Sequence, residues 1–192
     1  DAMEGPKPVS ALIHAATMVA AGVFLVARTF PFFEVGQTEH IVAAVGAVTA
    51  LVAALIALGQ YDLKRILAFS TISQLGLMMV GIGVAGVAVG MVHLLTHAFF
   101  KALLFLGAGS IIHGCHEQQD IRKMGGVWKP MRITSIAYMC GALALVAFPF
   151  TSGFFSKEAI LNGAWKPGDP NMMGIFWICA LASLLTALYM TR

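Results

Sequence analysis

The sequence predicts an all-α protein, a polytopic bundle of about six transmembrane crossings, one of them a broken helix. Of its 192 residues, 59% are hydrophobic and 11% are charged, whereas a soluble globular domain has about 25% charged residues. Long apolar runs alternate with short polar segments, and in lipid a helix satisfies its own backbone polar groups. We expect a single transmembrane domain over residues 1–192, with the bilayer as a partner and no nucleic acid.

Six apolar segments account for these crossings. One of them is interrupted at residues 148–153, FPFTSG. Because proline removes a helix hydrogen bond and glycine loosens the following turn, we expect two half-helices, 133–147 and 154–162, hinged at Pro149 and Gly153. Residues 29–40 are expected to form a loop. The five uninterrupted segments are residues 8–28, 41–59, 66–84, 86–112 and 172–190.

The distribution of basic residues supports this topology. If the two half-helices count as one crossing, ten of the twelve lysines and arginines lie in loops and two lie within spans. One side holds Arg28 and Lys166. The other side holds Lys7, Lys64, Arg65, Arg122, Lys123, Lys129, Arg132 and Arg192. By the positive-inside rule, the second side is cytoplasmic or its equivalent.

The segment 86–112 contains three ionisable residues, His93, His97 and Lys101. They are four residues apart, and a helix turns about 100° per residue, so each step drifts only about 40° and all three lie on one face. A lysine at membrane depth costs about 2.5–3.5 kcal/mol on insertion scales. A sequence that places these groups on one stripe within a span is expected to use them.

Two further ionisable residues, His14 and Lys157, fall within expected spans. Burial favours the neutral form of a lysine, so a buried lysine can load and release protons. Imidazoles titrate near neutral pH, and transporters place ion sites at broken helices. Together with the stripe on segment 86–112, these residues predict a proton path.

Structural interpretations stay open beside this one. His14 can be a histidine that is hydrogen-bonded between helices, and Thr96 is expected to be a packing residue. Lys157 can lie near a membrane surface and pair with Glu158 or a lipid headgroup. Lys101 lies near the middle of a long span, where snorkelling is difficult.

Metal and haem binding form another class of function that histidine and cysteine residues can indicate. His113, Cys115 and His116 resemble a fragment of a metal site but lack a second cluster, so we expect loop residues and no metal. His93 and His97 share one helix face and cannot bind opposite axial positions of one haem. A membrane cytochrome is therefore the weaker alternative, which a Soret band would support.

Four stretches carry a resemblance to a known family. They are DAMEGPKPVSALIHAATMVAAGVFLVAR (1–28), YDLKRILAFSTISQLGLM (61–78), HLLTHAFFKALLFLGAGSIIHGCHEQQDIRKMGG (93–126) and FPFTSGFFSKEAIL (148–161). The chain resembles the subunit L (subunit 5) family of respiratory NADH-quinone oxidoreductase, complex I. These antiporter-like subunits are related to the large subunits of multisubunit Na⁺/H⁺ antiporters, which are the alternative interpretation.

The resemblance implies a fold of two inverted repeats, each with a broken helix, of which this chain would hold mainly the second. It implies that Lys101 in THAFFKALLF belongs to the central hydrophilic axis. It also implies that Lys157 in GFFSKE faces the proton exit path, and that Lys64 in YDLKR lies near the cytoplasmic end.

For the histidines, the resemblance implies that His93 and His97 in HLLTH belong to the polar axis and that His14 in ALIHAATM links two half-channels. The chain opens with Asp1 rather than Met, so we expect a piece of a longer protein, without a signal peptide. The family's first-half glutamate and first-half lysine would lie upstream. The fragment is therefore not expected to translocate protons alone.

The implied mechanism is indirect. Electron transfer from NADH to quinone in other membrane-arm and redox subunits would drive protonation changes at the buried lysines. NADH, FMN, iron–sulfur clusters and quinone are expected to bind partner subunits, because no GxGxxG fingerprint or cysteine cluster occurs here. The chain would thus be a translocase subunit without its own redox centre. We expect it to be integral to a bacterial inner membrane, with an organellar inner membrane as the alternative.

Overall fold

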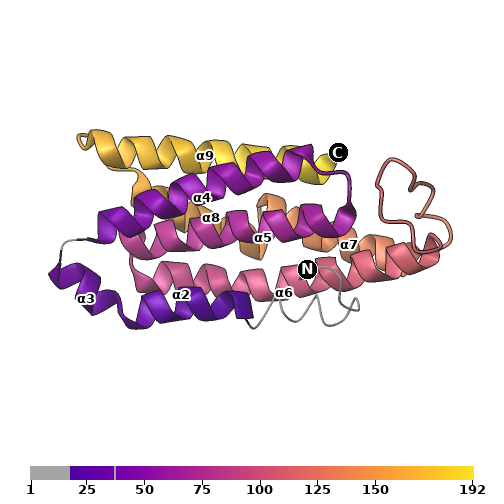
Figure 1. The fold of residues 1–192 in the computed structure, drawn as a ribbon, viewed down its shortest axis with the longest axis horizontal. Coiled ribbons are helices and arrows are strands. Elements are labelled where there is room, and N and C mark those ends of the chain that lie inside the picture. Colours follow the sequence, from indigo (N-terminus) through magenta and orange to yellow (C-terminus); the bar gives the residue numbers. More distant parts are fainter. Residues whose placement is uncertain (1–17, 37) are drawn as a thin grey trace.

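The computed structural model describes residues 18–36 and 38–192. All regular structure in this part of the chain is helical, which confirms the predicted fold class (Figure 1). The elements are α2 (Met18–Arg28), α3 (Phe30–Val35), α4 (Glu39–Gly59), α5 (Leu63–Val80), the π-helical turn η1 (Gly81–Ala85), α6 (Val87–Gly114), α7 (Arg132–Val146), α8 (Ser152–Ala164) and α9 (Pro170–Thr191).

Four helical stretches in the described part are long and apolar enough to cross a membrane: α4, α5 with η1, α6 and α9. They run lengthwise, α5 in the opposite direction to α4, α6 and α9 (Figure 1). They coincide with four of the expected segments. The shorter helices α7 and α8 replace the interrupted segment. The first expected crossing, 8–28, is described only from Met18 onward, so its beginning and His14 lie outside the described residues.

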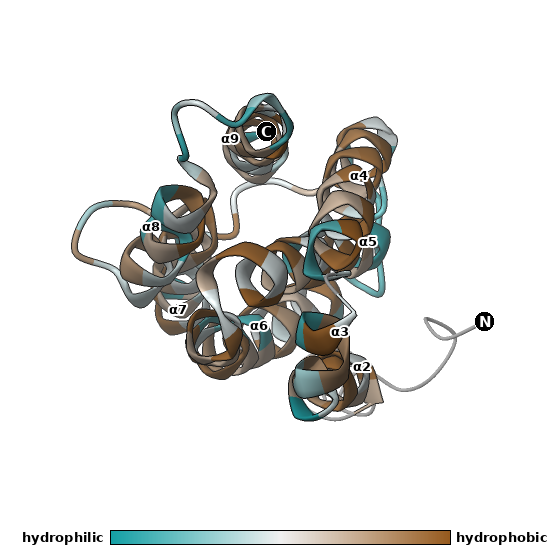
Figure 2. Ribbon diagram, turned by 90° about the vertical axis from the view of Figure 1, so that its left-hand side faces the viewer, coloured by the Kyte–Doolittle hydropathy of each residue, from teal (hydrophilic) through white to brown (hydrophobic). Residues whose placement is uncertain are grey.

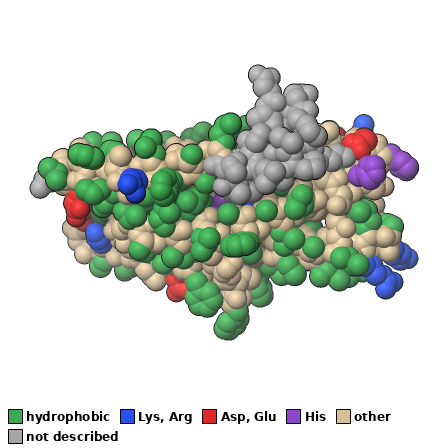
Figure 3. All heavy atoms as spheres, turned by 90° about the horizontal axis from the view of Figure 1, so that it is seen from below, with side chains coloured by type: hydrophobic (Ala, Val, Ile, Leu, Met, Phe, Trp, Pro, Cys, Tyr) green, Lys and Arg blue, Asp and Glu red, His purple; other side chains and the backbone are tan. Residues whose placement is uncertain are grey.

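The outer surface of the bundle is apolar. Viewed end-on, α7 and α8 lie together at one side and α4 lies at the other, with α6 between α8 and α2 (Figure 2). On the face drawn in Figure 3, hydrophobic side chains cover most of the surface and charged ones lie mainly toward the ends. Large exposed side chains of α6 are Val92, Leu95 and Phe99. This surface fits contact with lipid, as expected of an integral, multi-pass protein.

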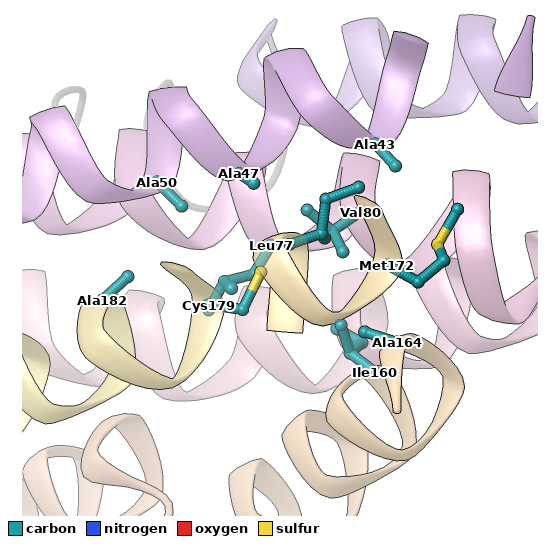
Figure 4. Close-up of a cluster of buried hydrophobic side chains, with 11 residues drawn as sticks. Ala43, Ala47, Ala50, Leu77, Val80, Ile160, Ala164, Met172, Cys179 and Ala182 are labelled. Atoms are coloured by element: carbon teal, nitrogen blue, oxygen red, sulfur yellow. The ribbon is translucent and has the colours of Figure 1, made fainter. Parts of the chain in front are cut away.

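Small residues bring α4 and α5 close together. A Cβ added to Gly46 would lie 2.7 Å from the carbonyl oxygen of Gly76, so neither position has room for a larger side chain. Ser73 on α5 donates a hydrogen bond of 2.9 Å to the carbonyl of Ala50 on α4. A cluster of buried apolar residues joins α4, α5, α8 and α9 (Figure 4). Close backbone approach of this kind is typical of helix packing in membranes.

One end of the bundle gathers the turn from α4 to α5, the loop after α6 and the end of α9. The Leu63 N–H donates to the Gln119 carbonyl at 3.0 Å. The Tyr61 ring lies between two guanidinium groups, at 4.1 Å from Arg122 and 4.5 Å from Arg192. Hydrogen bonds from Arg122 hold the pKa of the exposed Asp120 carboxyl at about 2. Loops assigned to the same membrane side thus meet at one end.

One local prediction was wrong, and one confirmed helix has an unexpected last turn. Residues 29–40 contain a short helix, α3, because Pro31 stands in its first turn, where a missing N–H costs nothing. The expected helix 66–84 ends in η1, a π-helical turn that packs against its neighbours through glycine. A Cβ on Gly83 would lie 2.6 Å from the Glu39 carbonyl, so only glycine permits this approach.

Candidate functional site

The ionisable stripe of α6 faces the interior of the bundle. His93, His97 and Lys101 are at most 1% exposed, whereas Phe99 on the opposite face is 73% exposed. The predicted single face is therefore confirmed, and it points between α5 and α8. Since α6 carries no other ionisable residue before His113, its buried polarity is concentrated in these three side chains.

Lys101 is held by main-chain and hydroxyl oxygens of α5. Its Nζ donates to the carbonyl of Leu67 at 3.0 Å and to the hydroxyl of Ser70. The Phe105 ring lies 5.9 Å from Nζ. Among the described residues, no carboxylate forms an ion pair with this lysine. A carbonyl accepts more strongly from an ammonium than from an amine, but it accepts from both, so the contact persists when the lysine is neutral.

Lys157 is held by the end of the half-helix α7. Its side chain is 3% exposed, and its Nζ donates to the carbonyl of Leu145 at 2.5 Å. The last carbonyls of a helix lack intrahelical partners. Two of them are satisfied locally, because the Phe148 N–H donates to Leu143 and the Ala147 N–H to Ala144. The break in the helix therefore supplies the acceptor for the lysine, at the negative end of the α7 dipole.

The break itself has a distinctive backbone. Ala147 and Phe150 adopt positive φ angles of 67° and 69°, on either side of Pro149. The Cα of Gly153 lies against the carbonyl of Ala144, so that a Cβ at this position would overlap that oxygen. Gly153 thus allows the two half-helices to meet closely rather than loosening the turn. That Pro149 and Gly153 act as a hinge stays a prediction.

His93 connects three helices. Its Nδ1 lies 2.8 Å from the Ser156 hydroxyl on α8, and its Nε2 lies 3.2 Å from the Oε1 of Gln74 on α5. Thr96 donates to the His93 carbonyl at 3.1 Å and lies 3.3 Å from the Ser156 hydroxyl. Both ring nitrogens of His93 are engaged, which argues against a role as a metal ligand.

His97 lies between the other titratable groups. Its ring centroid is 6.3 Å from that of His93 and 5.4 Å from that of Phe100. Its Nε2 is buried without a hydrogen-bond partner among the described residues, and both Lys101 and Lys157 lie within its electrostatic reach. Buried polar atoms are nearly always paired, so an imidazole nitrogen without a partner between two lysines points to a functional position rather than a structural one.

The structure places the remaining predicted residues away from the row formed by Lys101, His97, His93 and Lys157. Glu158 is exposed on α8, and no ion pair joins it to Lys157 in the described part of the chain. Lys64 lies half-buried in the first turn of α5. His113 pairs with Glu117 at 3.2 Å on the surface, and the described residues contain no group of three metal-ligating side chains.

Three polar residues of the site were not assigned to it from the sequence. They are Ser70 and Gln74 on α5 and Ser156 on α8. A signal was present, because Ser70 and Gln74 are four residues apart on α5, the spacing of the α6 stripe. In an antiparallel pair such residues meet opposite partners, and here Ser70 meets Lys101 and Gln74 meets His93.

Ionisable residues buried within membrane spans mark functional positions, such as ion pathways and proton relays, in membrane proteins. The particular family follows from comparison. Residues 1–186 match the family described as NADH:quinone oxidoreductase/Mrp antiporter, transmembrane, and the chain belongs to it.

Curated relatives are similar over the whole chain. It is 50% identical over 193 residues to NADH-ubiquinone oxidoreductase chain 5 of Acanthamoeba castellanii, which covers 100% of this chain and 29% of the relative. It is also 50% identical over 201 residues to NAD(P)H-quinone oxidoreductase chain 5 of Picosynechococcus sp. (strain ATCC 27264 / PCC 7002 / PR-6), covering 100% and 30%. The chain thus spans less than a third of the length of these relatives.

Solved structures share the fold. The Mrp complex from Dietzia sp. DQ12-45-1b contains a chain with a TM-score of 0.87 and 26% identity, covering 96% of this chain and 35% of that one. The membrane-bound sulfane sulfur reductase, an archaeal respiratory membrane complex, gives a TM-score of 0.89 and 28% identity, covering 100% and 40%.

Proposed function

We propose that this chain forms part of the proton-translocating core of a membrane subunit of NADH:quinone oxidoreductase. The observation that carries the proposal is the buried row that runs from Lys101 through His97 and His93 to Lys157. It passes from α6 to α8, and its lysines bind oxygens of carbonyl and hydroxyl groups rather than carboxylates. Protons move along this row as electrons pass from NADH to quinone in partner subunits.

The site supports proton transfer because its charges are not fixed. An ion pair with a carboxylate would hold a buried lysine in its charged form. A carbonyl at the end of α7 binds the Lys157 ammonium, and it still accepts from the neutral amine after the proton has left. Since both states keep a hydrogen bond, Lys157 can change protonation without leaving a buried acceptor unpaired.

The partners of the chain follow from the same proposal. The row contains no cysteine and no metal-ligand cluster among the described residues, and His93 uses both ring nitrogens for hydrogen bonds. We therefore assign NADH, FMN, the iron–sulfur clusters and quinone to partner subunits. Within the complex, the other membrane-arm subunits are the expected neighbours, and redox energy reaches this chain as a conformational or electrostatic change.

A second candidate is the large subunit of a multisubunit Na⁺/H⁺ antiporter. The similarity to a chain of the Mrp complex favours it, while the 50% identity to subunits of quinone oxidoreductases favours the first candidate. The two make different predictions for sealed vesicles. An antiporter exchanges protons for a cation without NADH, whereas the oxidoreductase subunit acidifies one side only when NADH is oxidised.

The test uses the full-length subunit in its complex, reconstituted in vesicles that contain a pH-sensitive dye. Lys101→Ala and Lys157→Ala are expected to lower NADH-driven proton transfer by about 10²-fold, the lower end of what a proton-transfer group contributes. Complex assembly on native gels should be less affected. Lys129→Ala, which removes an exposed loop lysine, is the matched control.

Lys157→Met and Lys101→Met separate charge from packing, because methionine keeps most of the apolar stem. They should lose proton transfer as the alanine variants do. Proton-to-electron ratios equal to those of Lys129→Ala in both lysine positions would overturn the proposed path.

A further inference from the structure

The surroundings of His93 allow two complete hydrogen-bonding states. From this geometry, and resting on the proposed proton path, we propose that Ser156 and Gln74 are positioning residues that set the tautomer of His93 and reverse it during each proton transfer. Neither residue belongs to the ionisable row. Both are at most 2% exposed, so water does not compete freely for the imidazole.

In the first state the imidazole carries its hydrogen on Nε2. The Nε2–H then donates to the Gln74 Oε1 at 3.2 Å, and the Ser156 hydroxyl donates to Nδ1 at 2.8 Å. The single hydrogen of the Thr96 hydroxyl can donate either to the Ser156 oxygen at 3.3 Å or to the His93 carbonyl at 3.1 Å. Each atom of the His93 ring that can form a hydrogen bond is satisfied in this arrangement.

In the second state the hydrogen is on Nδ1, which donates to the Ser156 oxygen. The serine hydroxyl hydrogen then has two acceptors within its own helix, the carbonyls of Ser152 at 3.1 Å and Gly153 at 3.3 Å. The Nε2 atom becomes an acceptor, and it is satisfied when the Gln74 amide turns so that its NH₂ faces the ring. The Gln74 Nε2 has no partner among the described residues, so this turn breaks no hydrogen bond there.

The second of these states is the beginning of one proton transfer, and the first is its end. When a proton from His97 binds at Nε2 and the proton on Nδ1 leaves to the neutral amine of Lys157, the next members of the row on either side, the net charge of the His93 imidazole is unchanged and its hydrogen has moved from Nδ1 to Nε2. A second proton can follow the same route only after the tautomer reverses. The Ser156 hydroxyl and the Gln74 amide supply the hydrogen bonds for either form, so the reversal leaves neither ring nitrogen of His93 unpaired.

The same serine connects His93 to the broken helix. Ser156 and Lys157 are consecutive on α8, and one contacts His93 on α6 while the other contacts the Leu145 carbonyl on α7. A shift of α8 therefore changes both contacts together. In this way the position of the half-helix determines which tautomer of His93 is favoured.

Removal of each partner is expected to shift the tautomers in opposite directions. In Ser156→Ala, an Nδ1–H would be a buried donor without an acceptor, so the ring keeps its hydrogen on Nε2. In Gln74→Leu, an Nε2–H loses its acceptor and the hydrogen moves to Nδ1. Each variant should change the tautomer ratio by about tenfold, as the loss of one buried hydrogen bond does. Ser156→Thr keeps a hydroxyl and should retain both tautomers.

The measurement is solid-state ¹⁵N NMR of the full complex carrying ¹⁵N-histidine in this subunit, with the His93 signals assigned by subtracting a His93→Gln sample. Ser73→Ala is the matched control, because Ser73 is a buried α5 serine that binds Ala50 and no member of the row. NADH-driven proton transfer is recorded on the same samples. It should fall about tenfold or more in Ser156→Ala and Gln74→Leu.

Tautomer ratios that stay equal to those of Ser73→Ala, or that move in the same direction in both variants, would overturn the inference whatever the rate of proton transfer. Opposite shifts with unchanged proton transfer would leave tautomer control standing and overturn the proposed route through His93. The two proposals therefore fail separately.

Discussion

Replacement of Gly153 by alanine tests the contact between the two half-helices. A Cβ at this position overlaps the carbonyl oxygen of Ala144, which belongs to a helix backbone and cannot rotate away. Overpacking of this kind costs about 1–3 kcal/mol. In an open helix position the same substitution would instead gain up to about 1 kcal/mol of helix propensity. Relief of the overlap moves α8 away from α7 and lengthens the hydrogen bond of Lys157.

Gly174→Ala is the matched control. Gly174 lies in α9 and has no neighbouring atom within 4 Å of an added Cβ, so the substitution should be neutral or stabilising. The free energy of unfolding of the two variants should therefore differ by about 1–4 kcal/mol, the sum of the overlap and the propensity terms. Unfolding of the purified full-length subunit in mixed detergent–SDS micelles, followed by circular dichroism, measures the difference.

Proton transfer gives a second measurement on the same variants. Because Gly153 and Lys157 are one turn apart on α8, Gly153→Ala should also slow NADH-driven proton transfer, and Gly174→Ala should not. Equal unfolding free energies for the two alanine variants would refute the reasoning, since they would show that the half-helices separate without cost.

Three further predictions concern the end of the bundle and the helix break. Tyr61→Ala should increase amide hydrogen exchange in residues 115–131, because it removes cation–π contacts to Arg122 and Arg192 worth about 0.5–1 kcal/mol each, whereas Tyr61→Phe should not. The pKa of the Asp120 carboxyl lies below its ordinary value of 3.8, so the carboxylate should stabilise the same loop fully above pH 3.8. This stabilisation should be lost as the pH falls through about 2, and Asp120→Asn should show no such pH dependence. Ala147→Gly should raise the free energy of unfolding by up to about 1 kcal/mol, because glycine adopts a positive φ without strain. This figure is net of the extra freedom that glycine has in the unfolded chain. A clear destabilisation would contradict the assigned backbone strain.

The helices that could be predicted from the sequence are those with a long apolar signal. The segments 41–59 and 172–190 agree with α4 and α9 to within two residues at each end. The break near Pro149 was also predictable, because a proline within an apolar run has few alternatives. The stripe of His93, His97 and Lys101 needed only the helical period, which is a local property.

The partners of that stripe were not predictable in the same way. The acceptor of Lys157 is the carbonyl of Leu145, and no side-chain type identifies which carbonyl a helix break leaves open. Ser156 touches His93 only because α8 folds back beside α6. The π-helical turn at Gly81–Ala85 depends on close packing against α4 and α8. Each of these features comes from tertiary contacts, which a single sequence does not record.

The two buried lysines use the same kind of hydrogen-bond acceptor. Both Lys101 and Lys157 donate to main-chain carbonyls, those of Leu67 and Leu145. A substitution at either leucine changes the side chain and leaves the acceptor in place. The hydrogen bond therefore depends on the lysine side chain and on the backbone, whereas the buried leucine side chains serve packing. Comparison of sequences would then identify the donors and miss the acceptors, which are inherited through the path of the backbone.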